Sequence, residues 1–467
     1  MKIFLCVALS CVLMYLVEAA IPTEMTVGVM EGAPLTTAAA QKTLIQTNAE
    51  KYMADLKKQL NTGEKYDIIV LPEYGLTGRN YDEKNAIEID KDNSSSSPDL
   101  DYLNKLASPT MIVVANLLEK DDDDIYSTTV ALDGSSKLLA KYRKININKT
   151  EDNLESADDV VSFVHPTLKN TIGLISGDDI LYENPIRKLI ENNATTIIYT
   201  SSMRSIAPFS VSLSLQAGFA KAEGVNLLVA SLSDPKNGTS GSGIFTPCGA
   251  EASFINADGL SKALKAKISV TPKDCNAKTL RHGFRTTSLG TETPVQTLLT
   301  YDLNGFTTQI VNKSIQNQEV CDGSFCCKFS ITAGTWIDSE HYRLAVGGDD
   351  QKICALMFCK DAADDIKNCG FIDSSAKATM TFDDISIGTT EDEDLFRPYI
   401  LHSNLVPDGN IGKVTFSEIS DAGTNFTATK VTDAIAVGIV SARSAANTLQ
   451  ILTTNVVILS VLLKYLL

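Results

Sequence analysis

The chain has 467 residues, of which 44% are hydrophobic and 21% charged, and this composition is that of an ordinary globular protein. Its formal net charge of −16 argues against nucleic acid or an anionic lipid surface as a partner. The residues between the two ends suffice for two domains, or for one large domain with a satellite.

The N-terminus has the pattern of a secretory signal peptide. Lys2 precedes an apolar run from Ile3 to Val17, and Glu18, Ala19 and Ala20 follow. A basic start, an apolar core and small residues at the end are typical of such a peptide. A membrane-spanning helix needs about 20 apolar residues, and this run is shorter. We therefore expect residues 1–20 to be a signal peptide that directs the chain into the secretory pathway.

Residues 22–250 alternate between predicted strands and helices. Helical spacing predicts a helix within Thr37–Leu60, another that starts at Pro185, and a third over Phe209–Ala222. This alternation predicts an α/β domain in which helices cover mixed sheets. Apolar runs predict strands at Met25–Met30, Asp67–Leu71, Met111–Ala115, Thr128–Leu132, Thr171–Ile175, Thr195–Tyr199 and Val225–Ala230.

Residues 251–440 have a different character. The segments are shorter, rich in Thr, Val and Ile, and separated by Gly, Asp and Asn, which predicts a β-rich domain. Within it, strands are expected at Leu298–Leu303, Phe306–Val311 and Cys327–Thr332.

Eight cysteines remain once the signal peptide is removed. An even number in a secreted chain predicts up to four disulfides, whose pairing the spacing leaves open. Zinc is the alternative, since two of these cysteines lie close together, but only four histidines occur and the compartment is oxidising. We expect no metal and no cofactor. The cysteines are Cys248, Cys275, Cys321, Cys326, Cys327, Cys354, Cys359 and Cys369.

Six Asn-x-Ser/Thr sequons fit the same compartment, and each predicts a glycosylated surface asparagine. They are Asn93, Asn148, Asn193, Asn237, Asn312 and Asn425.

The C-terminus ends in a second apolar run, from Ile451 to Leu467, preceded by a cluster of small residues from Ser441 to Ala446. Small residues, a short polar spacer and an apolar tail predict a GPI-attachment signal. Ser444 is the favoured attachment residue, with Ser441 and Ala445 as competitors, and residues 445–467 would be removed. The alternative is a membrane-spanning tail, which the short run disfavours. We expect the lipid anchor to hold the protein on the extracellular face of the cell.

Two segments place charged groups where chemistry could occur. Glu73 follows the predicted strand that ends in Val70-Leu71-Pro72, where partial burial would raise its pKa and suit it to proton transfer. Lys141-Tyr142-Arg143-Lys144 follows another strand-like segment, and a lysine in a cleft can stabilise an oxyanion. Taken alone, these residues are more often surface charges.

Together, five blocks in order resemble the vanin and biotinidase branch of the nitrilase, or carbon–nitrogen hydrolase, superfamily. The resemblance implies an αββα sandwich followed by the β-rich, disulfide-stapled domain. The blocks are Leu71-Pro72-Glu73 with Tyr74 to Gly78, Lys141 to Lys144 with Glu151, Ile172 to Pro185, Gly241 to Pro247, and Val320-Cys321 through Cys327.

The resemblance also implies residue roles. Glu73 would be the general base, Lys144 the oxyanion donor, and Glu151 the glutamate that steadies the lysine. The cysteine nucleophile should fall between Ser176 and Asp178, where the chain has Gly177, and no mature cysteine precedes Cys248. Because glycine cannot form a covalent acyl intermediate, the loss removes the nucleophile of a catalytic unit, which typically lowers the rate by about six orders of magnitude.

Substitutes for the nucleophile are poor. The side chain of Ser176 should point away from the site if the strand continues, and serine needs a stronger activating base than cysteine. A water activated by Glu73 is the other substitute. Because glycine removes a side chain, we expect open space beside Gly177.

Three functions remain as hypotheses. The first is a surface-displayed, catalytically inactive protein that binds a small amide, of the pantetheine or biotinyl-amide type that the resemblance implies, or a protein partner. The second is an active amidohydrolase with an unusual nucleophile, and the third is a structural surface glycoprotein whose pocket has collapsed. The oligomeric state stays open.

Overall fold

The computed structural model describes fifteen stretches of the chain between residues 21 and 442: 21–60, 65–81, 83–89, 98–104, 110–134, 138–151, 153–255, 259–272, 299–348, 351–361, 366–370, 378–389, 396–402, 414–419 and 423–442. The expected signal peptide, Asn93, Cys275, Ser444 and the expected propeptide 445–467 lie outside these residues. Over the described stretches, no helix is both long enough and apolar enough to span a bilayer.

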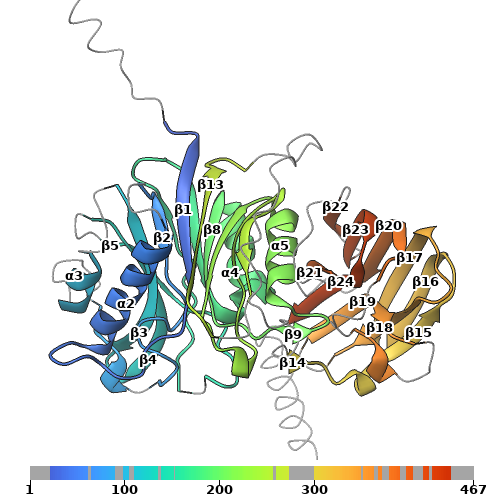
Figure 1. Ribbon diagram of the computed structural model, residues 1–467, viewed down its shortest axis with the longest axis horizontal. Helices are drawn as coiled ribbons and strands as arrows, with labels where there is room; N and C mark the ends of the chain where they lie inside the picture. Colours follow the sequence, from blue (N-terminus) through green and yellow to red (C-terminus); the bar gives the residue numbers. More distant parts are fainter. Residues whose placement is uncertain are drawn as a thin grey trace, which may run out of the picture.

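Two six-stranded sheets pack face to face in the N-terminal unit (Figure 1). Their facing sides share one apolar core, to which Val27, Val114, Ile172 and Ile198 belong. The first sheet has the order β13 (Lys262–Ser269), β1 (Glu24–Glu31), β2 (Ile68–Val70), β3 (Ile112–Asp121), β4 (Asp124–Leu132) and β5 (Leu138–Arg143). The second has the order β12 (Gly249–Phe254), β11 (Ser242–Thr246), β10 (Asn226–Ser231), β8 (Thr196–Ser201), β7 (Thr171–Ser176) and β6 (Ser162–Val164).

Helices cover both outer faces and complete the expected αββα layering. α2 (Leu44–Gln59) and α3 (Pro98–Asn104) lie over the first sheet, where Ile45, Tyr52 and Leu103 join its apolar side chains. α4 (Glu183–Glu191) and α5 (Ser212–Glu223) cover the second sheet. The first helix is shorter than its predicted range because Thr43 caps it, accepting a hydrogen bond from the backbone N–H of Gln46.

The N-terminal unit extends past the boundary that we expected at residue 250. β13 pairs antiparallel with β1 over their whole length, from Glu24 opposite Ser269 to Glu31 opposite Lys262. β12 closes the edge of the second sheet by pairing with β11. The short strands that follow Glu251 therefore first complete the sandwich, and the C-terminal domain begins after them.

The C-terminal domain consists of two five-stranded antiparallel sheets. One has the order β15 (Thr307–Val311), β18 (His341–Gly347), β19 (Gln351–Cys359), β24 (Ala434–Ala442) and β21 (Arg397–His402). The other has the order β16 (Ile315–Asp322), β17 (Phe325–Thr335), β20 (Thr381–Thr389), β23 (Gly423–Thr432) and β22 (Val414–Ile419). Within the described part of the predicted strand Leu298–Leu303, strand is confined to β14 (Leu299–Thr300), which pairs with β9 (Ile206–Ala207). Asp302 then caps the short helix η5 (Leu303–Gly305).

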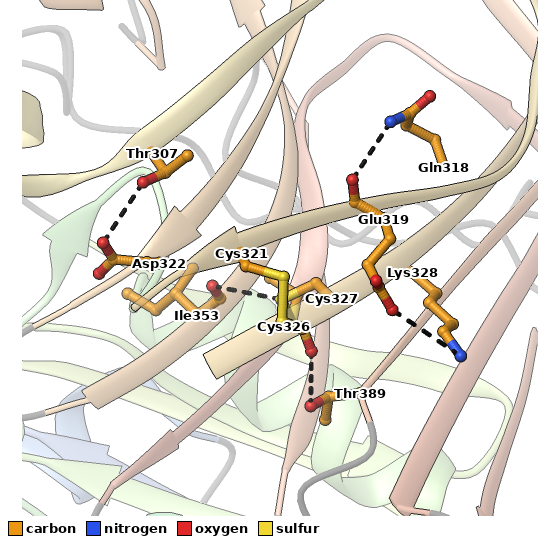
Figure 2. The surroundings of a disulfide bond; sticks show 11 residues. Thr307, Gln318, Glu319, Cys321, Asp322, Cys326, Cys327, Lys328, Ile353 and Thr389 are labelled. Carbon is orange, nitrogen blue, oxygen red and sulfur yellow. Dashed lines mark hydrogen bonds and ion pairs between the residues drawn. A yellow bond between two sulfur atoms is a disulfide. The ribbon is translucent and has the colours of Figure 1, made fainter. Parts of the chain in front are cut away.

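Disulfides staple this domain, as expected. Cys321–Cys326 closes the β16–β17 hairpin, where Figure 2 also shows the Cys326 carbonyl accepting a 3.0 Å hydrogen bond from Thr389. Cys327–Cys354 joins β17 to β19 and so ties the two sheets together. Cys359–Cys369 is the third bond, and Cys248 of the first unit is also disulfide-bonded.

The two units meet closely along α5 and β21 (Figure 1). A Cβ at Gly218 of α5 would lie 1.7 Å from the Pro398 carbonyl oxygen, so only glycine permits this approach. The fully buried Arg397 pairs with Glu223 and donates from Nε to the Ile180 carbonyl at 2.8 Å. Ile180 belongs to the short helix η2 (Gly177–Leu181), so the C-terminal domain holds the turn that contains Gly177.

Candidate functional site

The structure brings Glu73, Lys144, Glu151 and Gly177 together between the two sheets. Glu73 follows β2, Lys144 and Glu151 follow β5, and Gly177 follows β7. Lys144 Nζ lies 3.1 Å from Glu73 Oε1 and 2.8 Å from each carboxylate oxygen of Glu151. The three charged residues are only 0%, 2% and 4% exposed, so their charges face one another and not water. We call Glu73, Lys144 and Glu151 the ion cluster.

Neighbouring polar groups fix the Glu151 carboxylate and the backbone turn that carries Glu73. Tyr74 donates its hydroxyl to Glu151 Oε1 at 2.6 Å, and the backbone N–H of Asn148 donates to Glu151 Oε2 at 2.8 Å. The Tyr74 N–H donates to Asn116 Oδ1 at 2.8 Å, which holds the turn that carries Glu73. Asn116 is the lone polar residue in the run Ile112–Leu118, and that interruption was the signal available in the sequence.

The turn at Gly177 is shaped by Asp179. This buried carboxylate accepts hydrogen bonds from the Ser176 N–H at 2.9 Å, from the Tyr142 hydroxyl at 2.5 Å and from the Asn146 N–H at 2.9 Å. Gly177 itself has φ of +53°, in the left-handed region that favours glycine. Its carbonyl accepts a 2.6 Å hydrogen bond from Tyr199.

Lys144 fills the space beside Gly177, where we expected an opening. A Cβ built on Gly177 would lie 2.2 Å from Lys144 Nζ, 2.5 Å from Lys144 Cε and 2.8 Å from Glu73 Oε1. These separations are far below the ordinary contact distance between carbon and nitrogen or oxygen atoms. The first side-chain atom of a nucleophile at position 177 would therefore occupy the place that the ammonium group holds.

The side chain of Ser176 lies apart from the ion cluster. Its buried hydroxyl lies among Thr129, Thr200 and Asn116, at 3.1 Å from Thr129 Oγ1 and 3.4 Å from Asn116 Nδ2. No hydrogen bond joins it to Glu73 or Lys144 within the part of the chain that is described. Alternation along β7 turns this side chain away from the ion cluster, as the sequence predicts.

The charges of the ion cluster are strongly coupled. Burial raises the pKa of Glu73 to about 7 despite the opposing Lys144 charge, and Glu151 adds to the rise. Burial alone would lower the pKa of Lys144, but Glu73, Tyr74 and Glu151 hold it well above its ordinary value. Burial would likewise raise the pKa of Glu151, and the ion pair and hydrogen bond from Lys144 lower it instead. Lys144 therefore stays protonated and cannot act as a nucleophile.

A second set of polar contacts borders the site. Arg79 donates to the Ser202 carbonyl at 2.7 Å and to Thr239 Oγ1 at 3.0 Å, and its Nη1 lies 3.5 Å from Asp234 Oδ2. Glu73 Oε2 forms no hydrogen bond of ordinary length within the described stretches, although the Ser202 side chain is near enough to lower the pKa of Glu73. Neither Arg79 nor Ser202 was singled out from the sequence.

The other predicted site residues lie on the surface or away from the ion cluster. Asn148, Asn193, Asn237 and Asn312 are exposed, and Asn425 is half-buried in β23. The bonded cysteines Cys321, Cys326, Cys327, Cys354, Cys359 and Cys369 belong to the C-terminal domain. Among the residues with a described position, no group of three or more His, Cys, Asp or Glu side chains could hold a metal ion.

We predict that Lys144→Met destabilises the protein more at pH 8 than at pH 5. Without the ammonium, the pKa of Glu73 rises further above the ordinary value of 4.5, and the pKa of Glu151 rises because the cation that lowers it is gone. The folded state then binds more protons than the unfolded state, so stability falls as the pH increases through this range. Removing one partner of a buried ion pair typically costs about 3–5 kcal/mol, which we expect at pH 8. At pH 5 the loss should be smaller by at least about 1.4 kcal/mol, the equivalent of one pKa unit.

Urea unfolding of the parent protein and of Lys144→Met, at pH 5 and at pH 8, measures the loss of unfolding free energy at each pH. Lys267→Met is the matched control because Lys267 pairs with Glu24 on the surface. Its effect should stay within about 0.5 kcal/mol at either pH. Equal losses for Lys144→Met at pH 5 and pH 8 would show that the carboxylates do not depend on the ammonium.

Comparisons with known proteins agree with this geometry. A carbon–nitrogen hydrolase family model matches residues 27–223, and a vanin C-terminal domain model matches residues 296–443. Vanin-like protein 3 of Drosophila melanogaster is 24% identical over 393 residues, covering 74% of this chain and 72% of that protein. Pantetheinase of Bos taurus is 24% identical over 415 residues, covering 78% and 80%.

Among solved structures, the Saccharomyces cerevisiae nitrilase-superfamily protein Nit3 aligns with a TM-score of 0.42 and 18% identity, over 53% of this chain and 91% of that chain. The two family models follow one another along the sequence in the order of the two structural units. The chain belongs to the vanin branch of the carbon–nitrogen hydrolase, or nitrilase, superfamily.

Proposed function

We propose that this vanin-like protein is an extracellular, lipid-anchored member of its family that does not hydrolyse amides. The observation that carries the proposal is the position of Lys144. The position at which the family's nucleophile is expected holds Gly177. The Lys144 ammonium occupies the place where a Cβ at this position would lie. A substrate carbonyl would thus meet neither a nucleophile nor open space at the point where the acyl bond forms.

The buried charges have a structural role in this reading. Lys144 links the turn after β2 to the loop after β5 through its two carboxylate partners. Because none of the three is more than 4% exposed, separating them would leave an uncompensated buried charge. The proposal therefore assigns the ion cluster to holding the fold, and assigns ligand or partner recognition to the surface of the two units.

The second candidate function is hydrolysis by a water molecule that Glu73 activates. The pKa of about 7 favours it, since a general base works best when its pKa lies near the operating pH. The 3.1 Å contact with Lys144 opposes it, because it engages one oxygen of Glu73 with a cation.

The extracellular location rests on several independent patterns. The N-terminal apolar run, six sequons and the C-terminal small-residue cluster with its apolar tail are all typical of a secreted, GPI-anchored protein. The bonds Cys321–Cys326, Cys327–Cys354 and Cys359–Cys369 suit an oxidising compartment.

An assay of pantetheine-amide hydrolysis tests the chemistry, since relatives named pantetheinase indicate the substrate to offer. We expect the secreted protein to leave the substrate unchanged. Gly177→Cys should gain turnover, because it supplies the missing thiol and the Lys144 ammonium, at the end of a long side chain, can be displaced at a cost in stability. Gly177→Cys combined with Glu73→Ala should lose that turnover, because the thiol then lacks its base.

The decisive control is Glu73→Ala in the otherwise unchanged chain. If the parent protein hydrolyses the amide and this substitution abolishes the activity, the second candidate function is correct and the first is wrong.

Phospholipase treatment tests the anchor. Phosphatidylinositol-specific phospholipase C should release the mature protein from intact cells that express it, because only the lipid of a GPI anchor holds the protein on the membrane. Replacing the small cluster residue Ser444 with Leu should reduce surface display if this is the attachment residue. Protein that stays on the membrane after the enzyme has released a GPI-anchored standard would favour the membrane-spanning tail.

A further inference from the structure

Among the sequons that the structure describes, the one at Asn148 lies next to the ion cluster. Asn148 is exposed and lies on the loop between Lys144 and Glu151. Its backbone N–H donates to Glu151 Oε2 at 2.8 Å, while its side-chain Nδ2 donates to Asp178 Oδ2 at 2.6 Å. Asn148 therefore contacts a member of the ion cluster and the residue that follows Gly177.

Two side-chain contacts join this loop to the turn at Gly177. Besides the bond from Asn148 to Asp178, Asn146 Nδ2 donates to Asp179 Oδ1 at 2.9 Å. Asn148 is exposed and Asp178 half-buried, whereas Gly177 and Asp179 beneath them are buried. Asp178 directly follows Gly177, and the Lys144 ammonium lies beside Gly177, so the junction lies close to the ammonium. We call the contact line formed by Asn146, Asn148, Asp178 and Asp179 the seam.

We propose that Asn148 carries an N-linked glycan that covers the seam and slows its opening. The inference rests on the proposed extracellular location, because the modification occurs in the secretory pathway. The oligosaccharide is transferred from a lipid diphosphate donor by the host transferase. A bond forms between Asn148 Nδ2 and the sugar C1, the bond from C1 to the diphosphate oxygen breaks, and the lipid diphosphate leaves with one Nδ2 proton.

The folded geometry accommodates this modification. Nδ2 keeps one hydrogen after glycosylation, so it can still donate to Asp178. The Thr150 hydroxyl and the Thr150 N–H both donate to Asn148 Oδ1 at 3.0 Å. These two bonds fix the side-chain amide of Asn148 through its oxygen and do not involve Nδ2. The first sugar is bonded to the atom that lies 2.6 Å from Asp178, so it sits directly over the exposed edge of the seam.

Glycan mapping of the full chain secreted from cultured animal cells tests the occupancy. The glycan is released by glycosidase in heavy-oxygen water, and mass spectrometry then identifies the labelled asparagines. We expect label at Asn148 and at the exposed Asn312 on the C-terminal domain. Label at Asn312 without label at Asn148 overturns this inference alone, whereas no label at any of the six sequons also overturns the proposed location.

Hydrogen exchange tests whether the glycan protects the seam. Thr150→Ala and Asn148→Gln both remove the sequon, but the first keeps Asn148 and its bond to Asp178, and the second keeps Thr150 and an amide. Thr150→Ser keeps the sequon, and Asn312→Gln removes a glycan elsewhere. We expect amide exchange over residues 145–151 and 176–181 to be at least about fivefold faster in Thr150→Ala and Asn148→Gln than in the parent protein. The controls Thr150→Ser and Asn312→Gln should exchange like the parent. Unchanged exchange in both sequon-removing variants would show that a glycan at Asn148 does not cover the seam.

Discussion

The buried contact of Lys144 with Glu73 and Glu151 is the interaction on which the rest of the site depends. A single ammonium lies 3.1 Å from one carboxylate and 2.8 Å from both oxygens of the other, with all three side chains almost completely removed from water. Such an arrangement is stable only while each charge keeps its partner. The same contact explains the raised pKa of Lys144 and the lowered pKa of Glu151.

The same contact determines what fills the space beside Gly177. Gly177 has no side chain, and the Lys144 ammonium stands where its Cβ would be. The backbone nevertheless keeps a tightly held turn, fixed by Asp179 below and by Tyr199 at the carbonyl. Arg397 of the C-terminal domain adds a bond to Ile180 within this turn. The turn that contains Gly177 is thus held by contacts from both units.

The sequence predicted the layers of the fold because periodicity and apolar runs are local properties. Family resemblance then placed Glu73, Lys144, Glu151 and Gly177 in one site, and the structure brings them together. The sequence could not predict the pairing of β13 with β1, since the register between distant strands depends on tertiary packing. The filled space beside Gly177 was also missed, because the direction of the Lys144 side chain depends on Glu73, which is 71 residues away in the sequence, as well as on the nearby Glu151.

A double-mutant cycle of Gly177→Ala and Lys144→Ala tests the central claim most directly. Unfolding free energies are measured at pH 5.5, where the carboxylates of the lysine variants can take up protons. If Lys144 fills the place of the Gly177 Cβ, Gly177→Ala should be less destabilising in the Lys144→Ala protein, by at least about 1 kcal/mol. The strain of φ at +53° is common to both backgrounds and cancels. Additive effects, with a coupling below about 0.5 kcal/mol, would mean that the space beside Gly177 is open and that the account is wrong.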